Sequence, residues 1–353
     1  MSILFAILLF SFLIFIHEFG HFIAAKLSGV QVNEFSMFMG PAIVKWKRGQ
    51  TQYSIRCIPI GGYCAMEGED GDSDNPRAFH KASWWKRLII LVAGAFMNFV
   101  AGVLIIAIML SCQPTYGSTQ LEKVEPWSSV ATGNGLLPGD EIVEFNGGKI
   151  RIYEDFILAT MLLPDGEYDF TVRRNGQLVE LSDVPMIRQT VTYEDGTQSQ
   201  LYGINFDVKD TTASSVVKQI LPTAGYHVRA VIVSLKMLFT GQAGLNDMGG
   251  PVLIVKMMSD TAEASENVGY ALLNLLYFGG FLAINLAVMN LLPIPALDGG
   301  RCVGLLVTTA IEKITKKKVD PKYEGYIHGA FMMLLLAFMA FIMFKDIFTI
   351  VKG

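Results

Sequence analysis

The first apolar segment, Ser2–Ala25, reads SILFAILLFSFLIFIHEFGHFIAA and carries one polar motif, His17-Glu18-Phe19-Gly20-His21. About 20 predominantly apolar residues are enough for a helix to cross the hydrocarbon core of a bilayer. The length of this segment therefore predicts a membrane span. Its histidines and glutamate predict a function, because ionisable side chains inside a membrane are costly unless they are paired or hydrated.

Three further segments have a similar length and contain no Asp, Glu, Lys or Arg: Leu88–Cys112, Gly269–Leu292 and Ile327–Phe344. In lipid the backbone must satisfy its own hydrogen bonds, so we expect each of them to be a helix. The sequence thus predicts a polytopic α-helical membrane protein with four transmembrane helices.

Composition and charge narrow the class of protein. The chain is 52% hydrophobic and 17% charged, and its 28 basic and 32 acidic residues give a net charge of −4. These values exclude a disordered chain and a nucleic-acid binder and indicate a lipid bilayer as the environment. Basic residues are dense in the loops after the first and third spans. The positive-inside rule therefore predicts cytoplasmic loops there, with both termini and the 113–268 insert on the outer side.

The polar motif of the first span has the form H-E-x-x-H. On a helix, His17 and His21 lie one turn apart on the same face and can both bind one metal ion. Glu18 lies beside them, where a carboxylate can take a proton from a metal-bound water. This residue set at this spacing predicts a catalytic zinc site with Glu18 as general base.

A catalytic zinc site needs a third protein ligand and an open position for water. Our candidate is Asp298, which follows the third apolar segment in the stretch NLLPIPALDGG beginning at Asn290. Pro293 and Pro295 end the helix there, so an extended segment can bring the carboxylate back to the first span. His328, early in the last span, is a rival ligand that lacks a motif partner.

The remaining segments predict accessory structures. Ala42–Trp46 and Gln52–Ile58 are expected to form a hairpin whose exposed edge can pair with an extended substrate. The insert contains a series of alternating strands and turns from Gly135 to Gly147, which predicts a β-rich domain. Apolar residues after it recur at helical spacing from Leu221 to Leu238, which predicts an amphipathic helix on the membrane surface.

Taken together, His17–His21 and the Asn290–Asp298 stretch resemble the site-2 protease family of intramembrane zinc metalloproteases, and within it the bacterial regulator of sigma-E protease type. Three more motifs carry the resemblance over nearly the whole chain: Pro59-Ile-Gly-Gly-Tyr63, Gly94-Ala-Phe-Met-Asn98-Phe and Gly250-Pro251. One position departs from it, because the family often has Gly-x-Gly where this chain has Phe38-Met39-Gly40.

The resemblance implies roles for individual residues. His17, His21 and Asp298 would hold Zn²⁺, Glu18 would be the catalytic base, and Asn290 would bind the substrate backbone near the scissile bond. The insert is similar to bacterial PDZ domains, which implies either peptide binding or a filter against bulky substrates. The implied substrates are single-span membrane proteins, either anti-sigma factors or remnant signal peptides, in the bacterial cytoplasmic membrane.

The expected organisation has four parts. Residues 1–112 hold the first two spans with a cytoplasmic hairpin at about 32–66, residues 113–210 a PDZ-like domain, residues 211–268 a membrane-surface helical region, and residues 269–353 the last two spans. We expect a monomer. Two alternatives stay open at this point, a membrane metal transporter and a non-catalytic PDZ-bearing membrane adaptor.

Overall fold

The computed structural model describes residues 2–69, 71, 73–132, 135–161, 163–193, 196–244, 248–265, 267–316 and 321–352. The chain divides into two compact units. Residues 1–106 and 231–353 form the helical unit, and residues 107–230 form the β-rich unit. Two helices, α2 and α4, begin in one unit and end in the other.

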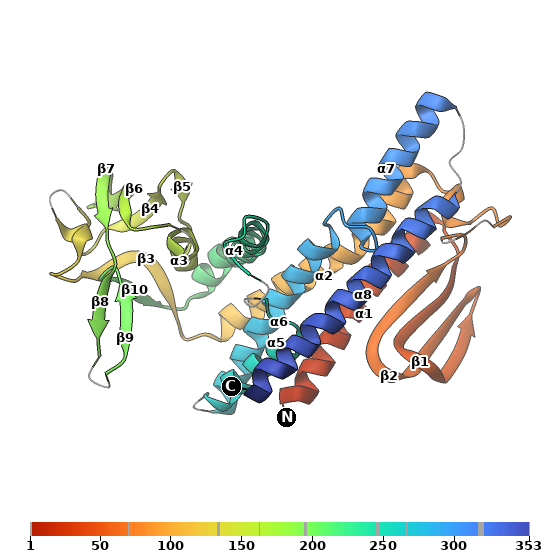
Figure 1. The fold of residues 1–353 in the computed structure, drawn as a ribbon, viewed down its shortest axis with the longest axis horizontal. Coiled ribbons are helices and arrows are strands. Elements are labelled where there is room, and N and C mark those ends of the chain that lie inside the picture. Colours follow the sequence, from red (N-terminus) through yellow and green to blue (C-terminus); the bar gives the residue numbers. More distant parts are fainter. Residues whose placement is uncertain are drawn as a thin grey trace. The chain divides into compact units, whose positions relative to one another are not determined.

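Four helices in the described part of the chain are long and apolar enough to cross a membrane. They are α1 (Ser2–Ser28), α2 (Trp84–Cys112), α6 (Val268–Asn290) and α8 (Pro321–Lys352). They confirm the four predicted helical segments. Each helix extends beyond its predicted segment at one end or both, and α6, which begins one residue early at Val268, also ends two residues early at Asn290. In Figure 1, α1 begins and α8 ends at the same end of the helical unit, as an even number of spans requires.

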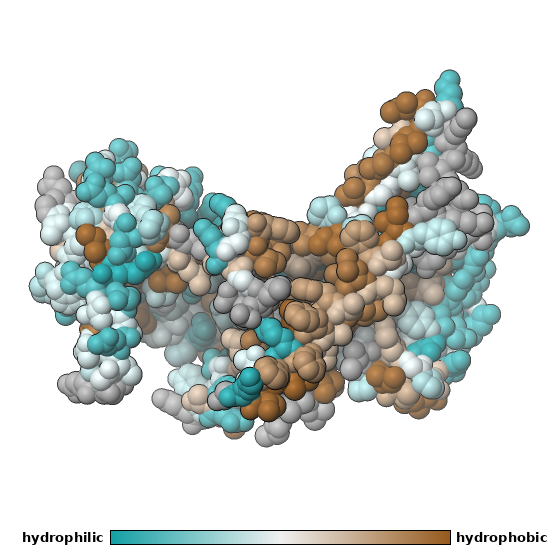
Figure 2. Space-filling model, viewed as in Figure 1, coloured by the Kyte–Doolittle hydropathy of each residue, from teal (hydrophilic) through white to brown (hydrophobic). Residues whose placement is uncertain are grey.

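Two shorter helices join them. The helix α5 (Pro251–Glu263) lies in the stretch expected at the membrane surface, and its buried Met258 packs with Ala6 of α1 and Leu275 of α6. The helix α7 (Asp298–Thr315) occupies what the sequence analysis left as a loop. A space-filling view shows predominantly hydrophobic residues over the helices and mainly polar residues over the strands (Figure 2).

The predicted hairpin is formed by β1 (Val32–Arg48) and β2 (Thr51–Met66). Both strands fold back on themselves, since Glu34 pairs with Ala65 and also with Gln52. Residues 32–37 therefore lie between the two halves of β2, and residues 42–48 form an outer edge.

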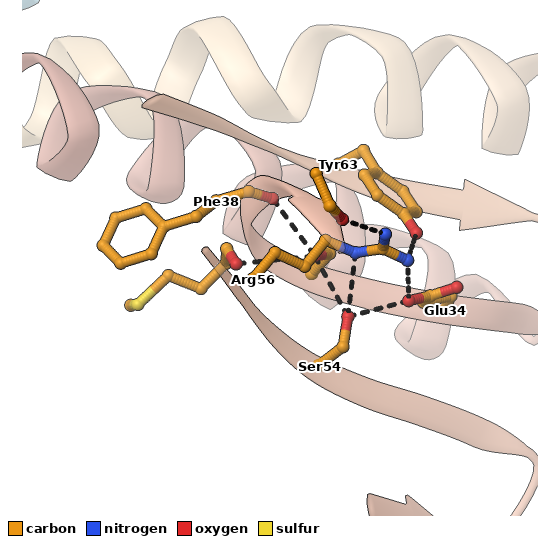
Figure 3. Close-up of polar contacts among 8 residues, drawn as sticks. Glu34, Phe38, Ser54, Arg56 and Tyr63 are labelled. Carbon is orange, nitrogen blue, oxygen red and sulfur yellow. Dashed lines mark hydrogen bonds and ion pairs between the residues drawn. The ribbon is translucent and has the colours of Figure 1, made fainter. Parts of the chain in front are cut away.

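A polar cluster inside the hairpin holds its bend (Figure 3). The Arg56 guanidinium donates to Glu34 at 2.8 Å, to the Tyr63 hydroxyl and to the carbonyl of Gly40 at 2.6 Å. Burial raises the pKa of the Glu34 carboxyl, but the hydrogen bonds from Arg56 and Ser54 outweigh it and bring that pKa to about 2. Glu34 is thus held as a carboxylate next to a permanent cation.

The β-rich unit contains one main sheet with strand order β10-β3-β4-β6-β7, a short β5 paired with β4, and a separate β8–β9 pair. The helix α3 (Tyr153–Met161) packs on this sheet through Phe156. The strands are β3 (Thr115–Val124), β4 (Glu141–Phe145), β5 (Gly148–Lys149), β6 (Gly166–Arg174), β7 (Gln177–Met186), β8 (Gln189–Thr192), β9 (Gln198–Leu201) and β10 (Ile204–Asp210). A 27-residue helix, α4 (Ala213–Phe239), follows and is tied to α3 by an ion pair between Arg229 and Asp155.

Candidate metal centre

Three potential metal donors from distant parts of the chain meet in the helical unit. His17 Nε2 lies 3.1 Å and His21 Nε2 lies 3.3 Å from Asp298 Oδ2. The two imidazole nitrogens are 3.2 Å from each other. The three atoms therefore form a nearly equilateral triangle, and they form the group of possible metal donors found in the described part of the chain.

The size of this triangle can be tested against zinc. Four ligand atoms arranged tetrahedrally at about 2.0–2.1 Å from Zn²⁺ are about 3.3–3.4 Å apart. The three distances here, 3.1–3.3 Å, match one face of such a tetrahedron. Asp298 Oδ2 is also buried without a hydrogen-bond donor among the described residues. A buried carboxylate oxygen in that state calls for a cation, and the fourth vertex leaves a place for water.

The two histidines come together because they are four residues apart on α1, and α2 comes close enough to hold them. Gly94 of α2 faces the pair, and a Cβ at this position would be 2.4 Å from His21 Nε2 and 2.8 Å from His17 Cε1. Only a glycine lets the α2 backbone pass this close to both rings.

Asp298 is positioned by an irregular segment, residues 291–297, which we call the ligand loop. Ala296 has a φ of 82°, a left-handed conformation that is rare for residues other than glycine. Its N–H donates to Nδ1 of His328 on α8 at 2.9 Å. The loop is tight at Gly300 too, where a Cβ would be 2.2 Å from the carbonyl oxygen of Ile294. His328 thus does not join the donor triangle but holds the loop that carries Asp298.

The Nδ1 atom of each imidazole, which faces away from the donor triangle, also has a polar group nearby. His21 Nδ1 lies 2.8 Å from the carbonyl oxygen of Ile90, so it carries the proton and leaves Nε2 as the donor to a metal. His17 Nδ1 lies 3.5 Å from the side-chain amide of Asn98 and 3.4 Å from that of Asn290. An amide oxygen and nitrogen are interchangeable by a flip, so the side-chain oxygen of either asparagine can accept a hydrogen bond from His17 Nδ1–H.

Glu18 lies near all three members of the donor triangle and close to the hairpin. The backbone of Cys64 in β2 lies beside its carboxylate. A Cβ built on the neighbouring Gly62 would be 3.8 Å from Glu18 Cγ. The glutamate therefore lies between the donor triangle and the bent hairpin, which places the hairpin next to the same site.

The structure brings together the five residues to which the sequence analysis assigned roles in the site: His17, Glu18, His21, Asn290 and Asp298. It adds Gly94, Asn98 and Ile90 of α2, which no composition or spacing argument could assign. Gly94 and Asn98 stood in one of the motifs that carried the resemblance, and that motif was the signal available in the sequence.

Comparisons with known proteins identify a peptidase family and relatives named as zinc metalloproteases. The family model "Peptidase family M50" matches residues 5–338. A Clostridium perfringens protein named "Putative zinc metalloprotease" is 36% identical over 348 residues, covering 98% of each chain. A Clostridium acetobutylicum protein of the same name is 36% identical over 353 residues, covering 98% of this chain and 97% of its own. The "Regulator of sigma-W protease RasP" of Bacillus subtilis is 27% identical over 414 residues, covering 94% of this chain and 95% of its own.

Proposed function

This chain belongs to peptidase family M50, the site-2 proteases, and is a zinc metalloprotease, and from that premise we propose that it cleaves membrane proteins within or beside their transmembrane segments. The observation that carries the proposal is the donor triangle itself, because two of its three members lie in a helix that is apolar enough to span a bilayer. A metal transporter or a non-catalytic adaptor does not account for a glutamate beside that triangle.

In this proposal, His17, His21 and Asp298 would hold Zn²⁺, which when bound would polarise the scissile carbonyl and lower the pKa of a water molecule to about 7. Glu18 takes a proton from the attacking water and passes it to the leaving amine of the cleaved peptide bond. The Cys64 backbone beside the Glu18 carboxylate would help to orient it for both transfers.

Asn290 is proposed to bind the substrate backbone next to the scissile bond. It is the last residue of α6, and its side-chain amide is 3.4 Å from His17 Nδ1. An amide at that point can exchange its weak contact with the imidazole for a hydrogen bond to a peptide group. Asn98, on the other side of His17, can then keep the ring in place.

The hairpin is proposed to present the substrate to the site as an extended strand. Its outer edge, residues 42–48, is unpaired on one side in the described structure and exposes Ile43, Val44 and Trp46. A transmembrane helix must unwind before its carbonyls can be attacked, and an open strand edge offers hydrogen-bond partners to the unwound segment. Apolar side chains along this edge suit a substrate that comes from the membrane.

The substrates proposed are single-span proteins such as anti-sigma factors or remnant signal peptides, and the process is regulated intramembrane proteolysis. The name of the Bacillus subtilis relative supports the first of these. We place the protein in the bacterial cytoplasmic membrane as a monomer. The hairpin would be cytoplasmic, and the termini and a PDZ-like domain at 113–210 would be on the outer side.

The test uses Glu18→Gln in the full chain, expressed together with a single-span membrane substrate. We expect one zinc per chain by metal analysis and no cleavage, because the amide keeps the shape of the side chain but cannot take a proton. Glu122→Gln, a change of the same kind at an exposed position of β3, is the control and should cleave normally. Undiminished cleavage by Glu18→Gln would refute the assignment of the base.

A further inference from the structure

The β-rich unit contains a polar cavity of about 320 Å³ that the proposed proteolysis does not use. Three segments line it: the beginning of β3, the residues before α3, and the end of β10 with the first turns of α4 (elements labelled in Figure 1). Its charged and hydroxyl-bearing lining includes Arg151, Lys209, Lys218, Ser118, Thr212 and Ser215.

All charged residues that line this cavity are positive. Arg151, Lys209 and Lys218 line it, and no Asp or Glu is among its lining residues. None of the three cations forms an ion pair with a described residue, and Lys209 Nζ instead donates to Gln120 Oε1 at 2.9 Å. Three like charges around one cavity repel one another, and an anion between them removes that repulsion. This focus of positive charge occurs in a chain whose net charge is −4.

The chemistry of the donors suits phosphate oxygens. A guanidinium offers a planar fork that can bind two oxygens, and lysines add mobile point charges. Ser118, which is 8% exposed, accepts a hydrogen bond from the Gln120 N–H at 3.2 Å, so its own proton is available to donate. The positive end of the 27-residue helix α4 adds to the field in the same direction.

The position of the cavity along the chain indicates where the phosphate comes from. The apolar helix α2 ends at Cys112, and the cavity lining begins at Tyr116. Four residues span at most about 14 Å even when fully extended. A headgroup layer adds about 5–8 Å to each side of the hydrocarbon core. Tyr116 therefore lies at most about 14 Å from Cys112, so the chain allows the cavity to reach the lipid headgroups at the end of α2.

We propose that this cavity binds the phosphate of an anionic phospholipid headgroup. Arg151 and Lys218 contact the phosphate oxygens, with Lys209 adding charge and Ser118 a hydrogen bond. Binding would tether the β-rich unit to the headgroup layer next to α2. The inference depends only on the cavity and the membrane span, so it stands or falls independently of the proteolytic mechanism.

The experiment titrates the purified full chain in detergent with dioctanoyl phosphatidylglycerol and counts bound lipid by native mass spectrometry. The test variant carries Arg151→Gln, Lys209→Gln and Lys218→Gln. The matched control carries Lys123→Gln, Lys149→Gln and Arg173→Gln, which change the charge of the same unit equally but lie outside the cavity lining. We expect at least tenfold weaker lipid binding in the test variant and less than a twofold change in the control.

Two further arms identify the ligand. Inorganic phosphate should compete with the lipid only weakly, and a short peptide with a free C-terminal carboxylate should not compete. Equal lipid binding by the wild type and the test variant would overturn the proposal. So would inorganic phosphate or the peptide binding as tightly as the lipid. The single variant Lys218→Gln, at an exposed helix position, should show a smaller loss of lipid affinity and guards against a folding defect in the triple variant.

Discussion

The substitution Gly94→Ala tests whether the donor triangle depends on the close approach of α2. Its Cβ would be 2.4 Å from His21 Nε2, whereas ordinary contacts of a Cβ begin near 3.4 Å. The obstacle is a pair of ring atoms rather than the end of a flexible chain, and the His21 ring is fixed by its bond to Ile90 O. His21 Nε2 would therefore have to move by about 1 Å, the difference between these two distances.

A movement of that size is large for a metal ligand. Zinc–ligand distances in functional sites stay within about 0.2 Å of their ideal values. Losing a single supporting partner of a ligand already costs about 10–100-fold in metal affinity. We therefore expect Gly94→Ala to weaken zinc binding by at least 100-fold. The added methyl group should also cost about 1–3 kcal/mol of stability through overpacking.

The two effects are separated by Gly102→Ala on the same helix. A Cβ there would be 2.6 Å from Ile284 Cγ1 and 3.2 Å from Ala283 Cβ of α6, so it overpacks the bundle without touching an imidazole. Zinc affinity is measured by competition with a chelator, and stability by thermal unfolding of the metal-free protein. The control should lose stability but keep its zinc affinity. Wild-type zinc affinity in Gly94→Ala would refute the reasoning.

Three further predictions follow from other contacts. Replacing His328 with Ala removes the acceptor that holds the ligand loop, and we expect zinc affinity in a chelator competition to fall, whereas His328→Asn should retain much of it because its carbonyl can accept the same bond. The pKa of Glu34 is lowered from 4.5 to about 2, so its stabilisation of the hairpin is complete above pH 4.5 and lost as the pH falls toward 2. Hydrogen exchange of the hairpin, corrected for intrinsic rates, should speed up over that range in the wild type but not in Glu34→Gln. Arg174→Leu strands the buried Asp140 carboxylate and should cost about 3–5 kcal/mol in denaturant unfolding. The exposed Arg173 pair is the control, and Arg173→Leu should cost less than about 1 kcal/mol.

The features that were predictable from the sequence are those set by local physics. Apolar runs of membrane-spanning length have few alternatives to a helix, so all four long apolar helices were identified. The spacing of His17 and His21 fixes their common face in any helix, so that pair could be named without tertiary information. Asp298 could be proposed as the third ligand from the sequence, because Pro293 and Pro295 indicate where the chain leaves α6.

Contacts between helices were not predictable. Gly94 and Asn98 face the histidines because of how α2 is rotated against α1, and a uniformly apolar helix has no periodic pattern that fixes its rotation. His328 was considered as a metal ligand because histidine in a span is costly. Its actual partner is a backbone N–H of the ligand loop, and main-chain donors leave no trace in the sequence. The helix α7 was not predicted, because the charged residues in this stretch were interpreted as belonging to a loop.

The bend of the hairpin places a residue other than glycine in a left-handed conformation. Phe38 stands where the family resemblance leads us to expect glycine, yet it has a φ of 69°, and Gly40 follows with 84°. A left-handed conformation costs a residue other than glycine about 1–2 kcal/mol. Two hydrogen bonds hold the carbonyls at this bend: Ser36 Oγ donates to Phe38 O at 3.2 Å, and Arg56 donates to Gly40 O at 2.6 Å. Such bonds contribute about 0.5–1.5 kcal/mol each, and more when the donor is charged, which is enough to offset the strain. The polar cluster around Arg56 therefore takes over the role of the missing glycine and keeps the hairpin bent beside the metal centre.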